Sequence, residues 1–124
     1  FAGTNTKVIV VEPATSQCFA AATEAGEPVD VTVAGVAADS LGARRVGTTN
    51  WNALRHAGAT SITVPDAAIL HAQRRFWSSA QLVVEPGGAT AAAALCCGAY
   101  VPEPDETVAV IVCGANCDPA SVAA

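Results

Sequence analysis

Three short segments place residues that could do chemistry directly after an apolar run. They are Val11-Glu12-Pro13, Val84-Glu85-Pro86-Gly87-Gly88-Ala89 and Val112-Cys113-Gly114-Ala115-Asn116. In a parallel α/β sheet, the carboxyl ends of the strands and the first turns of the following helices line the ligand crevice. The sequence therefore predicts a ligand site that combines a carboxylate, a thiol and a glycine-containing turn.

Glu85 and Cys113 each allow two interpretations. Glu85 precedes a proline at the expected first position of a helix, so its carboxylate could accept N–H bonds of that helix or lie beside a bound cofactor. The Cys113 thiol could be a weak structural hydrogen-bonding group or a ligand contact. No histidine lies near Cys113, which argues against a Cys–His nucleophile. His56 and His71 fall on expected helices, where we predict surface or packing roles.

Other chemistries lack their motifs. The sequence has no GxSxG, HExxH or P-loop pattern, and Cys113 and Cys117 lack the spacing of a zinc site. The adjacent Cys96 and Cys97 lie in an alanine run and are expected to be small core residues. Five cysteines without a signal peptide indicate a reducing, cytoplasmic protein.

Charge and hydrophobicity exclude two kinds of partner. Six Lys and Arg against eleven Asp and Glu give a net charge of -5, which argues against binding of nucleic acid or of an anionic membrane. The pairs Arg44-Arg45 and Arg74-Arg75 are expected on solvated helix faces. The most apolar stretch, Leu82 to Val101, is interrupted after Val84 and is too short to span a membrane.

Strand and helix patterns alternate along the chain. Strands are predicted at Lys7–Glu12, Thr60–Val64 and Val108–Val112, and helices at Ala14–Ala25, Leu41–Ala57, Asp66–Ala80 and Pro86–Tyr100. Asp39-Ser40 is expected to cap the second of these helices. The alternation indicates an α/β class with a mostly parallel sheet.

The sequence also suggests that further chain belongs with this one. It contains no methionine, and Phe1 to Asn5 reads as the last turn of a helix closed by Gly3. Three strands make a thin sheet, and charged residues are only 14% of the chain, so some faces are expected to meet a partner. We therefore expect this single segment of residues 1–124 to be completed by an N-terminal half or by a companion chain.

Five segments resemble, in order, the C-terminal part of fold-type II pyridoxal-phosphate enzymes, in particular the threonine/serine dehydratase (ammonia-lyase) and serine racemase group. They are KVIVVEPATS, VAGVAADSLGARRVG, SITVPDAAIL, LVVEPGGATAAAAL and VAVIVCGANCD. One such segment is weak evidence, whereas five in the family's order and spacing are strong. The resemblance implies a three-layer α/β sandwich with a mostly parallel sheet, forming part of the large domain of such an enzyme.

The resemblance also implies a chemistry. In this family a lysine forms a Schiff base with pyridoxal 5'-phosphate, which acts as an electron sink while the β-hydroxyl leaves as water, giving a 2-oxo acid and ammonia. Cys113 matches the residue that faces the pyridine nitrogen, Gly114 would let the backbone approach the ring, and Glu85 would lie near the cofactor. The lysine, the substrate-carboxylate loop and the phosphate loop would all precede Phe1. The catalytic lysine is therefore absent, because Lys7 lies outside the family's lysine context, and the chain alone is expected to be inactive.

Two positions depart from the family's pattern. Some members bind a divalent cation at positions that match Glu12, Ser16 and Cys18, but a thiol is a poor ligand for Mg²⁺ or Ca²⁺. Ala115 replaces the second glycine of the family's GGN turn. A dehydratase acting on a small hydroxy-amino acid, as a homodimer when complete, is the leading prediction. The alternatives are a non-catalytic degenerate domain for assembly or small-molecule binding, and another fold-type II activity such as racemisation or β-replacement.

Overall fold

Two β-branched runs form a parallel sheet in the computed structural model, which describes residues 1–123. Strand β1 (Ile9–Pro13) pairs with β2 (Thr60–Val64), with Ile9 opposite Thr60 and Pro13 opposite Val64. The strands end together, so their carboxyl ends lie at one edge of the sheet. The predicted strand at Thr60–Val64 is confirmed, and the one at Lys7–Glu12 is shifted to begin at Ile9.

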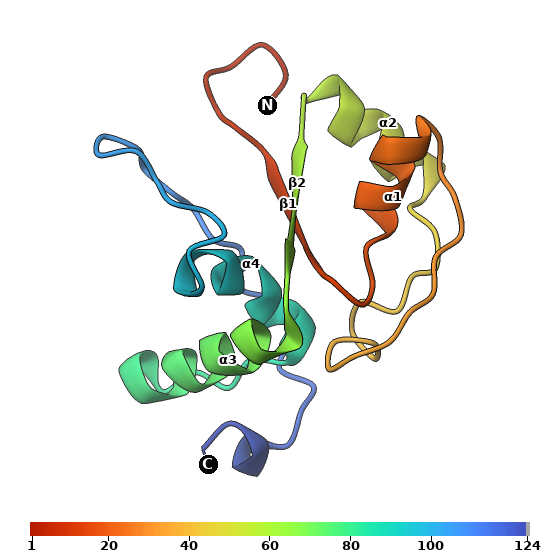
Figure 1. Ribbon diagram of the computed structural model, residues 1–124. Helices are drawn as coiled ribbons and strands as arrows, with labels where there is room; N and C mark the ends of the chain where they lie inside the picture. Colours follow the sequence, from red (N-terminus) through yellow and green to blue (C-terminus); the bar gives the residue numbers. More distant parts are fainter. Residues whose placement is uncertain (124) are drawn as a thin grey trace.

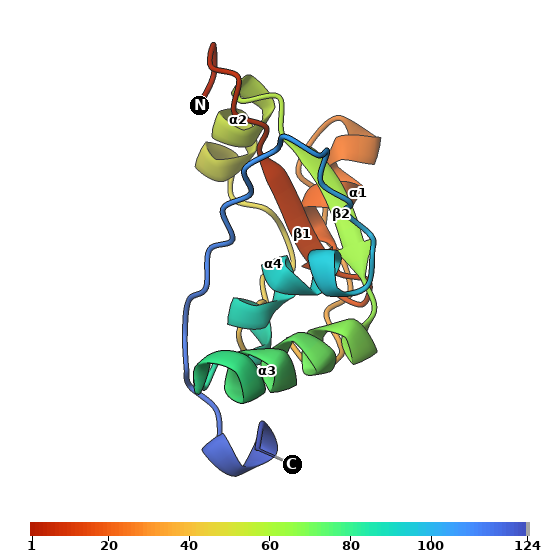
Figure 2. The same ribbon diagram turned by 90° about the vertical axis from the view of Figure 1, so that its left-hand side faces the viewer.

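Helices lie on both sides of this sheet (Figures 1 and 2). Helices α1 (Cys18–Ala25) and α2 (Thr48–His56) lie on one side. Helices α3 (Asp66–Ala80) and α4 (Pro86–Cys96) lie on the other, and both α1 and α4 pack against the two strands. A short 3₁₀ helix, Pro119–Ser121, lies near the C-terminus. The predicted three-layer α/β arrangement with a parallel sheet is confirmed.

Each side of the sheet has its own hydrophobic core. On the α1–α2 side, Phe19 and Trp51 meet edge to face with ring centroids 5.7 Å apart, beside the buried Val46. On the α3–α4 side, small residues dominate, with Val64, Ile69 and Val84 as the larger buried members. Alanines allow α3 and α4 to pack closely, but each buries little apolar area and so contributes little stabilisation.

Three predicted helices are shorter than their sequence patterns suggested. The helices expected at Ala14–Ala25, Leu41–Ala57 and Pro86–Tyr100 are observed at Cys18–Ala25, Thr48–His56 and Pro86–Cys96. The first begins late because Ala14 N still donates across to Val64 O of β2, and Ser16 N then closes a turn onto Pro13 O, both at 2.9 Å. The segment before Thr48 is a loop, so Arg44 and Arg45 do not lie on a helix face as predicted.

The predicted third strand, Val108–Val112, is not a strand. The segment is extended in Figure 2 but has no ladder partner among residues 1–123, where the sheet has two strands. Its pattern is that of a buried strand, yet Ile111 is 78% exposed and Val108 and Val112 are partly exposed. A strand forms only where a neighbour supplies its hydrogen bonds. No helix in the described chain is both long and apolar enough to cross a membrane.

Candidate functional site

The carboxyl ends of β1 and β2 are tied to the loop that precedes α2. Ala34 N donates to Thr15 O at 3.0 Å, and Val36 N donates to the Asp66 carboxylate at 3.0 Å. Asp66 is the first residue of α3, so its negative charge also complements the helix N-terminus. Gly35 has φ +86°, and a Cβ on it would meet the Thr15 and Asp66 side chains. Only a glycine lets this loop lie so close to the strand ends.

Glu85 lies at the N-cap position of α4, and its side chain reaches away from that helix. Its carboxylate accepts a hydrogen bond from Asn116 N at 3.2 Å, while its own backbone N–H donates to Gly114 O at 3.1 Å. It makes no side-chain bond to the N–H groups of α4. Of the two interpretations of Glu85, helix capping is therefore wrong. The carboxylate instead holds the Cys113–Asn116 turn.

Two glycines allow this turn to lie against α4. Gly114 has φ +72°, and a Cβ there would overlap the Glu85 carboxylate. Gly88, in the first turn of α4, faces the carbonyl of Cys113, which a Cβ would overlap. The left-handed conformation and the absence of a side chain are both needed at Gly114.

The structure thus brings together the three residues predicted to face a cofactor, Cys113, Gly114 and Glu85. Glu85 is half-buried behind the turn, whereas Cys113 is exposed and lies before Gly114. A thiol at this point is a weak neutral donor. The arrangement can present a neutral sulfur and a bare stretch of backbone to a flat ligand, with a carboxylate fixed behind them.

Ser40 joins this region, although its sequence context predicted a different role. Its hydroxyl oxygen accepts a hydrogen bond from Gly87 N, in the first turn of α4, at 2.9 Å. Asp39-Ser40 was expected to cap the helix that follows it, but that helix begins only at Thr48. Ser40 therefore accepts a hydrogen bond from a helical residue 47 positions further along the chain. Nothing local in the sequence marks this contact.

The residues at the predicted cation positions are engaged in other bonds. Both oxygens of Glu12 accept backbone N–H bonds at the start of α1, from Phe19 at 2.8 Å and from Ala20 at 2.9 Å. Ser16 Oγ donates to Leu41 O at 2.9 Å. Burial, and then the neighbouring Glu12 charge, raise the pKa of the Cys18 thiol. Among residues 1–123, no group of three or more His, Cys, Asp or Glu side chains is placed to hold a metal ion.

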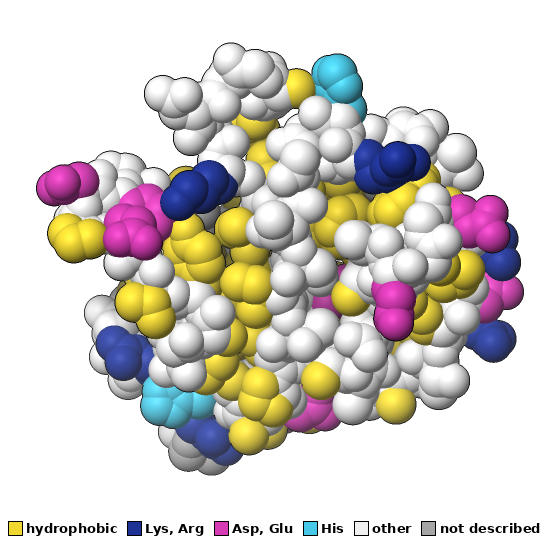
Figure 3. All heavy atoms as spheres, turned by 45° about the horizontal axis from the view of Figure 1, so that its top comes forward, with side chains coloured by type: hydrophobic (Ala, Val, Ile, Leu, Met, Phe, Trp, Pro, Cys, Tyr) yellow, Lys and Arg dark blue, Asp and Glu magenta, His cyan; other side chains and the backbone are white. Residues whose placement is uncertain are grey.

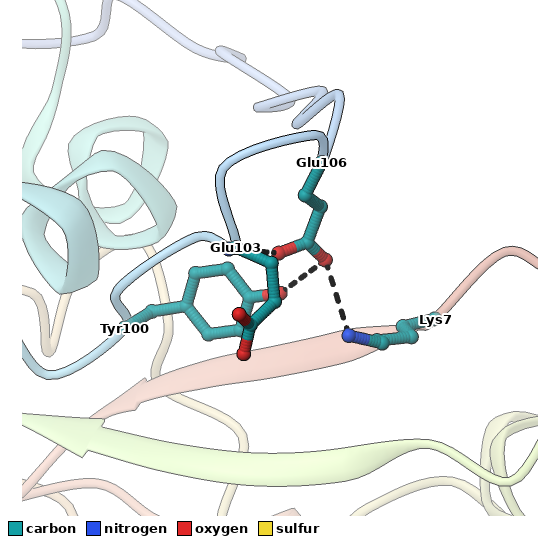
Figure 4. A network of polar contacts seen from close by, with 4 residues as sticks. All are labelled: Lys7, Tyr100, Glu103 and Glu106. Carbon is teal, nitrogen blue, oxygen red and sulfur yellow. Dashed lines mark hydrogen bonds and ion pairs between the residues drawn. The ribbon is translucent and has the colours of Figure 1, made fainter.

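The one lysine of the chain lies in a separate polar network (Figure 4). Lys7 Nζ is 3.5 Å from a carboxylate oxygen of Glu106, and the Tyr100 hydroxyl donates to that same oxygen at 2.5 Å. The other oxygen accepts the backbone N–H of Glu103 at 3.1 Å. The network ties the acidic loop after α4 to the segment before β1. His56 and His71 are exposed on α2 and α3, as the sequence suggested.

Comparisons with known proteins extend this local picture to the whole chain. The family described as pyridoxal-phosphate dependent enzyme matches residues 1–114. A biosynthetic L-threonine dehydratase of Mycobacterium bovis is 34% identical over 117 residues, which cover 93% of this chain and 27% of that protein. The chain thus spans about a quarter of that relative's length.

Solved structures agree with this assignment. A threonine deaminase from T.th. superposes with a TM-score of 0.79 and 31% identity, covering 91% of this chain and 40% of that one. The serine racemase from Dictyostelium discoideum gives a TM-score of 0.80 and 25% identity, covering 92% of this chain and 36% of that one. On the match over residues 1–114, the chain belongs to the family of pyridoxal-phosphate dependent enzymes.

Proposed function

We propose that this chain is the C-terminal part of the catalytic unit of a hydroxy-amino-acid dehydratase. The reaction removes water from L-threonine or L-serine and releases a 2-oxo acid and ammonia. The observation that carries the proposal is the junction of Glu85, Gly114 and the exposed Cys113 at the start of α4. The dehydratase and deaminase names of the relatives support the choice of reaction.

The residues present fit one side of a pyridoxal-phosphate site. Bound cofactor would supply an electron sink for the carbanion that precedes loss of the β-hydroxyl. Cys113 would present a neutral, weak donor to the pyridine nitrogen, and Gly114 would leave room for the ring. Glu85 would keep the turn in place through Asn116. With bound cofactor, a neutral residue at the position of Cys113 would leave the pyridine nitrogen largely unprotonated and would thereby favour elimination over transamination.

The partner proposed for this chain is an N-terminal half that carries the catalytic lysine and the phosphate loop. Three observations support it. Val108–Val112 is extended and unpaired within the described residues, and hydrophobic side chains reach the surface there. In the view of Figure 3, yellow hydrophobic side chains reach the surface in patches between white atoms, and most charged groups stand toward the margins. Lys7 is engaged with Glu106 at the other end of β1 from the site.

The extended segment Val108–Val112 needs a neighbour, because an exposed apolar segment with unpaired backbone groups invites aggregation. We therefore expect the isolated chain to bind cofactor poorly and to be inactive. A homodimer of the complete enzyme is proposed on the same ground, since a chain with 14% charged residues has apolar faces to cover. Five free cysteines support a reducing cytoplasmic location for it.

Racemisation is the second candidate, because the serine racemase superposes as well as the threonine deaminase. The test is product analysis with the protein expressed from its complete reading frame. L-threonine and L-serine are supplied with pyridoxal phosphate, and 2-oxo acid, ammonia and D-amino acid are quantified. Equal amounts of 2-oxo acid and ammonia are expected. D-serine as the main product would replace the dehydratase with a racemase, and no turnover by a folded, cofactor-loaded protein would favour a non-catalytic domain.

A further inference from the structure

We propose that Ser40 is a positioning residue for the cofactor-facing turn, acting through the first turn of α4. The inference rests on the proposed function, since it concerns the same Cys113–Asn116 turn. The hydrogen bonds of the Ser40 hydroxyl are made to Ala37 O and Gly87 N, and neither partner is a residue predicted to face the cofactor. It acts instead on the backbone that places Glu85.

Ser40 contacts the N-terminus of α4. The first N–H groups of a helix lack intrahelical acceptors and need outside partners. In α4, Pro86 has no N–H, so Gly87 is the first residue with a donor, and it donates to Ser40 Oγ at 2.9 Å. Gly87 also fits tightly, because a Cβ on it would lie 2.6 Å from Ser40 Oγ and 2.8 Å from Ser40 Cβ. The loop thus meets α4 through both a hydrogen bond and close packing.

Contacts within its own loop hold Ser40 in place. Its hydroxyl donates to Ala37 O at 3.4 Å, within the same turn, which leaves a lone pair for Gly87 N. The next residue, Leu41, is tied to the strand end because its carbonyl accepts from Ser16 Oγ at 2.9 Å. The loop therefore links the carboxyl end of β1 to the N-terminus of α4.

Glu85 connects the first turn of α4 to the Cys113–Asn116 turn. Glu85 is two residues before Gly87 and sits at the N-cap of α4. Its backbone N–H and its carboxylate hold Gly114 O and Asn116 N at 3.1 and 3.2 Å. A shift of the first turn of α4 would move both of these groups at once. Ser40 therefore positions the Cys113–Asn116 turn indirectly. Its bond to Gly87 holds the first turn of α4, and Glu85 in turn binds Asn116.

The experiment measures the turn directly, in the cofactor-free protein from the complete reading frame. Amide hydrogen exchange at Asn116 is compared in wild type, Ser40→Ala and Ser40→Thr, and the dissociation constant for pyridoxal phosphate is then titrated. Loss of one net hydrogen bond predicts exchange about twofold to tenfold faster in Ser40→Ala, with a weakened cofactor affinity. Ser40→Thr, which retains the hydroxyl, is expected to restore both values. Ser79→Ala is the matched control, since Ser79 Oγ donates to Arg75 O on the exposed face of α3.

A second variant keeps the test open if Ser40→Ala does not fold. Gly87→Ala adds a Cβ against Ser40 and is expected to produce the same two changes from the other side of the contact. Unchanged exchange at Asn116 in folded Ser40→Ala or Gly87→Ala would overturn the inference. Faster exchange combined with no cofactor binding by wild type would support the link from Ser40 to the turn and overturn the proposed function instead.

Discussion

The Glu85 carboxylate accepts the backbone N–H of Asn116 across 31 residues of chain, at 3.2 Å. This bond, with the reverse bond from Glu85 N to Gly114 O, joins the N-terminus of α4 to the segment after Val112. The contact depends on glycines rather than on a large buried area. Substitutions here are therefore expected to affect the turn more than the rest of the fold.

Gly114→Ala tests the need for a bare backbone at the turn. The left-handed conformation costs an alanine about 1–2 kcal/mol, and the new Cβ would displace the Glu85 carboxylate. We expect faster hydrogen exchange at Asn116 and weaker cofactor binding. Gly98→Ala is the matched control, because Gly98 has φ +75° and no heavy atom of the described residues 1–123 comes within 4 Å of its Cβ position. Equal effects of the two variants on Asn116 would contradict the role given to Gly114.

Gln73→Ala tests the hydrogen bond that fixes the backbone just before Glu85. The buried Gln73 donates from Nε2 to Val84 O at 2.7 Å, one residue before Glu85. Removing the donor leaves a buried carbonyl without a partner, so the free energy of unfolding is expected to fall by about 1–3 kcal/mol. Urea denaturation measures this. Gln81→Ala removes a similar bond from the exposed end of α3 and is expected to change stability by less than about 0.5 kcal/mol. A loss in Gln73→Ala no larger than in Gln81→Ala would refute the account.

The helix and strand predictions that the structure confirms are those with a local signal. The α3 pattern runs from Asp66 to Ala80 in both sequence and structure, because Pro65 precedes it and one apolar face recurs through it. Cys113, Gly114 and Glu85 were singled out because each follows an apolar run. They do lie together, but the strand-end rule does not account for it, because neither of the apolar runs before them is a paired strand among residues 1–123. The orientation of the Glu85 side chain could not be predicted either.

Contacts set by distant parts of the chain were missed. Serine is a common helix cap, but Ser40 binds α4 through Gly87 N rather than the helix that follows it in sequence. No local sequence pattern indicates this contact. Val108–Val112 carries the pattern of a strand, but pairing needs a neighbour that residues 1–123 do not supply. The late start of α2 likewise reflects the bond between Ser16 and Leu41, which holds the preceding loop at the sheet edge.

Acidification tests the Glu106 network. The Tyr100 hydroxyl lowers the pKa of Glu106 below its ordinary 4.5, and the same bond raises the pKa of Tyr100 above its ordinary 10.0. A carboxyl with a depressed pKa binds fewer protons when folded, so its contribution is present above pH 4.5 and is lost as pH falls through the folded pKa. The Tyr100 contribution is present below pH 10.0 and is lost as pH rises through its folded pKa.

The stability difference between wild type and Glu106→Gln, measured by urea denaturation, is therefore expected to be larger at neutral pH than below pH 4.5. Glu103→Gln serves as the control, since Glu103 joins the network through its backbone N–H. A difference that stays constant across this range would show that ionised Glu106 does not stabilise the fold.

Divalent cations test the residues at the start of α1. Because both Glu12 oxygens accept N–H bonds, Mg²⁺ or Ca²⁺ is expected to leave the free energy of unfolding unchanged. A bound ion would instead raise stability with its concentration. Glu12→Ala is expected to lower stability by about 1–3 kcal/mol with or without the ion, because two N–H groups lose their acceptor. A cation-dependent rise that disappears in Glu12→Ala would establish a metal site.

Ammonia release from L-threonine and L-serine tests the proposed dehydratase activity directly. It is measured with pyridoxal phosphate for the protein of the complete reading frame and for the 124-residue chain. We expect ammonia and an equal amount of 2-oxo acid from the complete protein, and neither product from the chain alone. Turnover by the isolated chain, or a complete protein that binds the cofactor and releases no ammonia, would contradict this expectation.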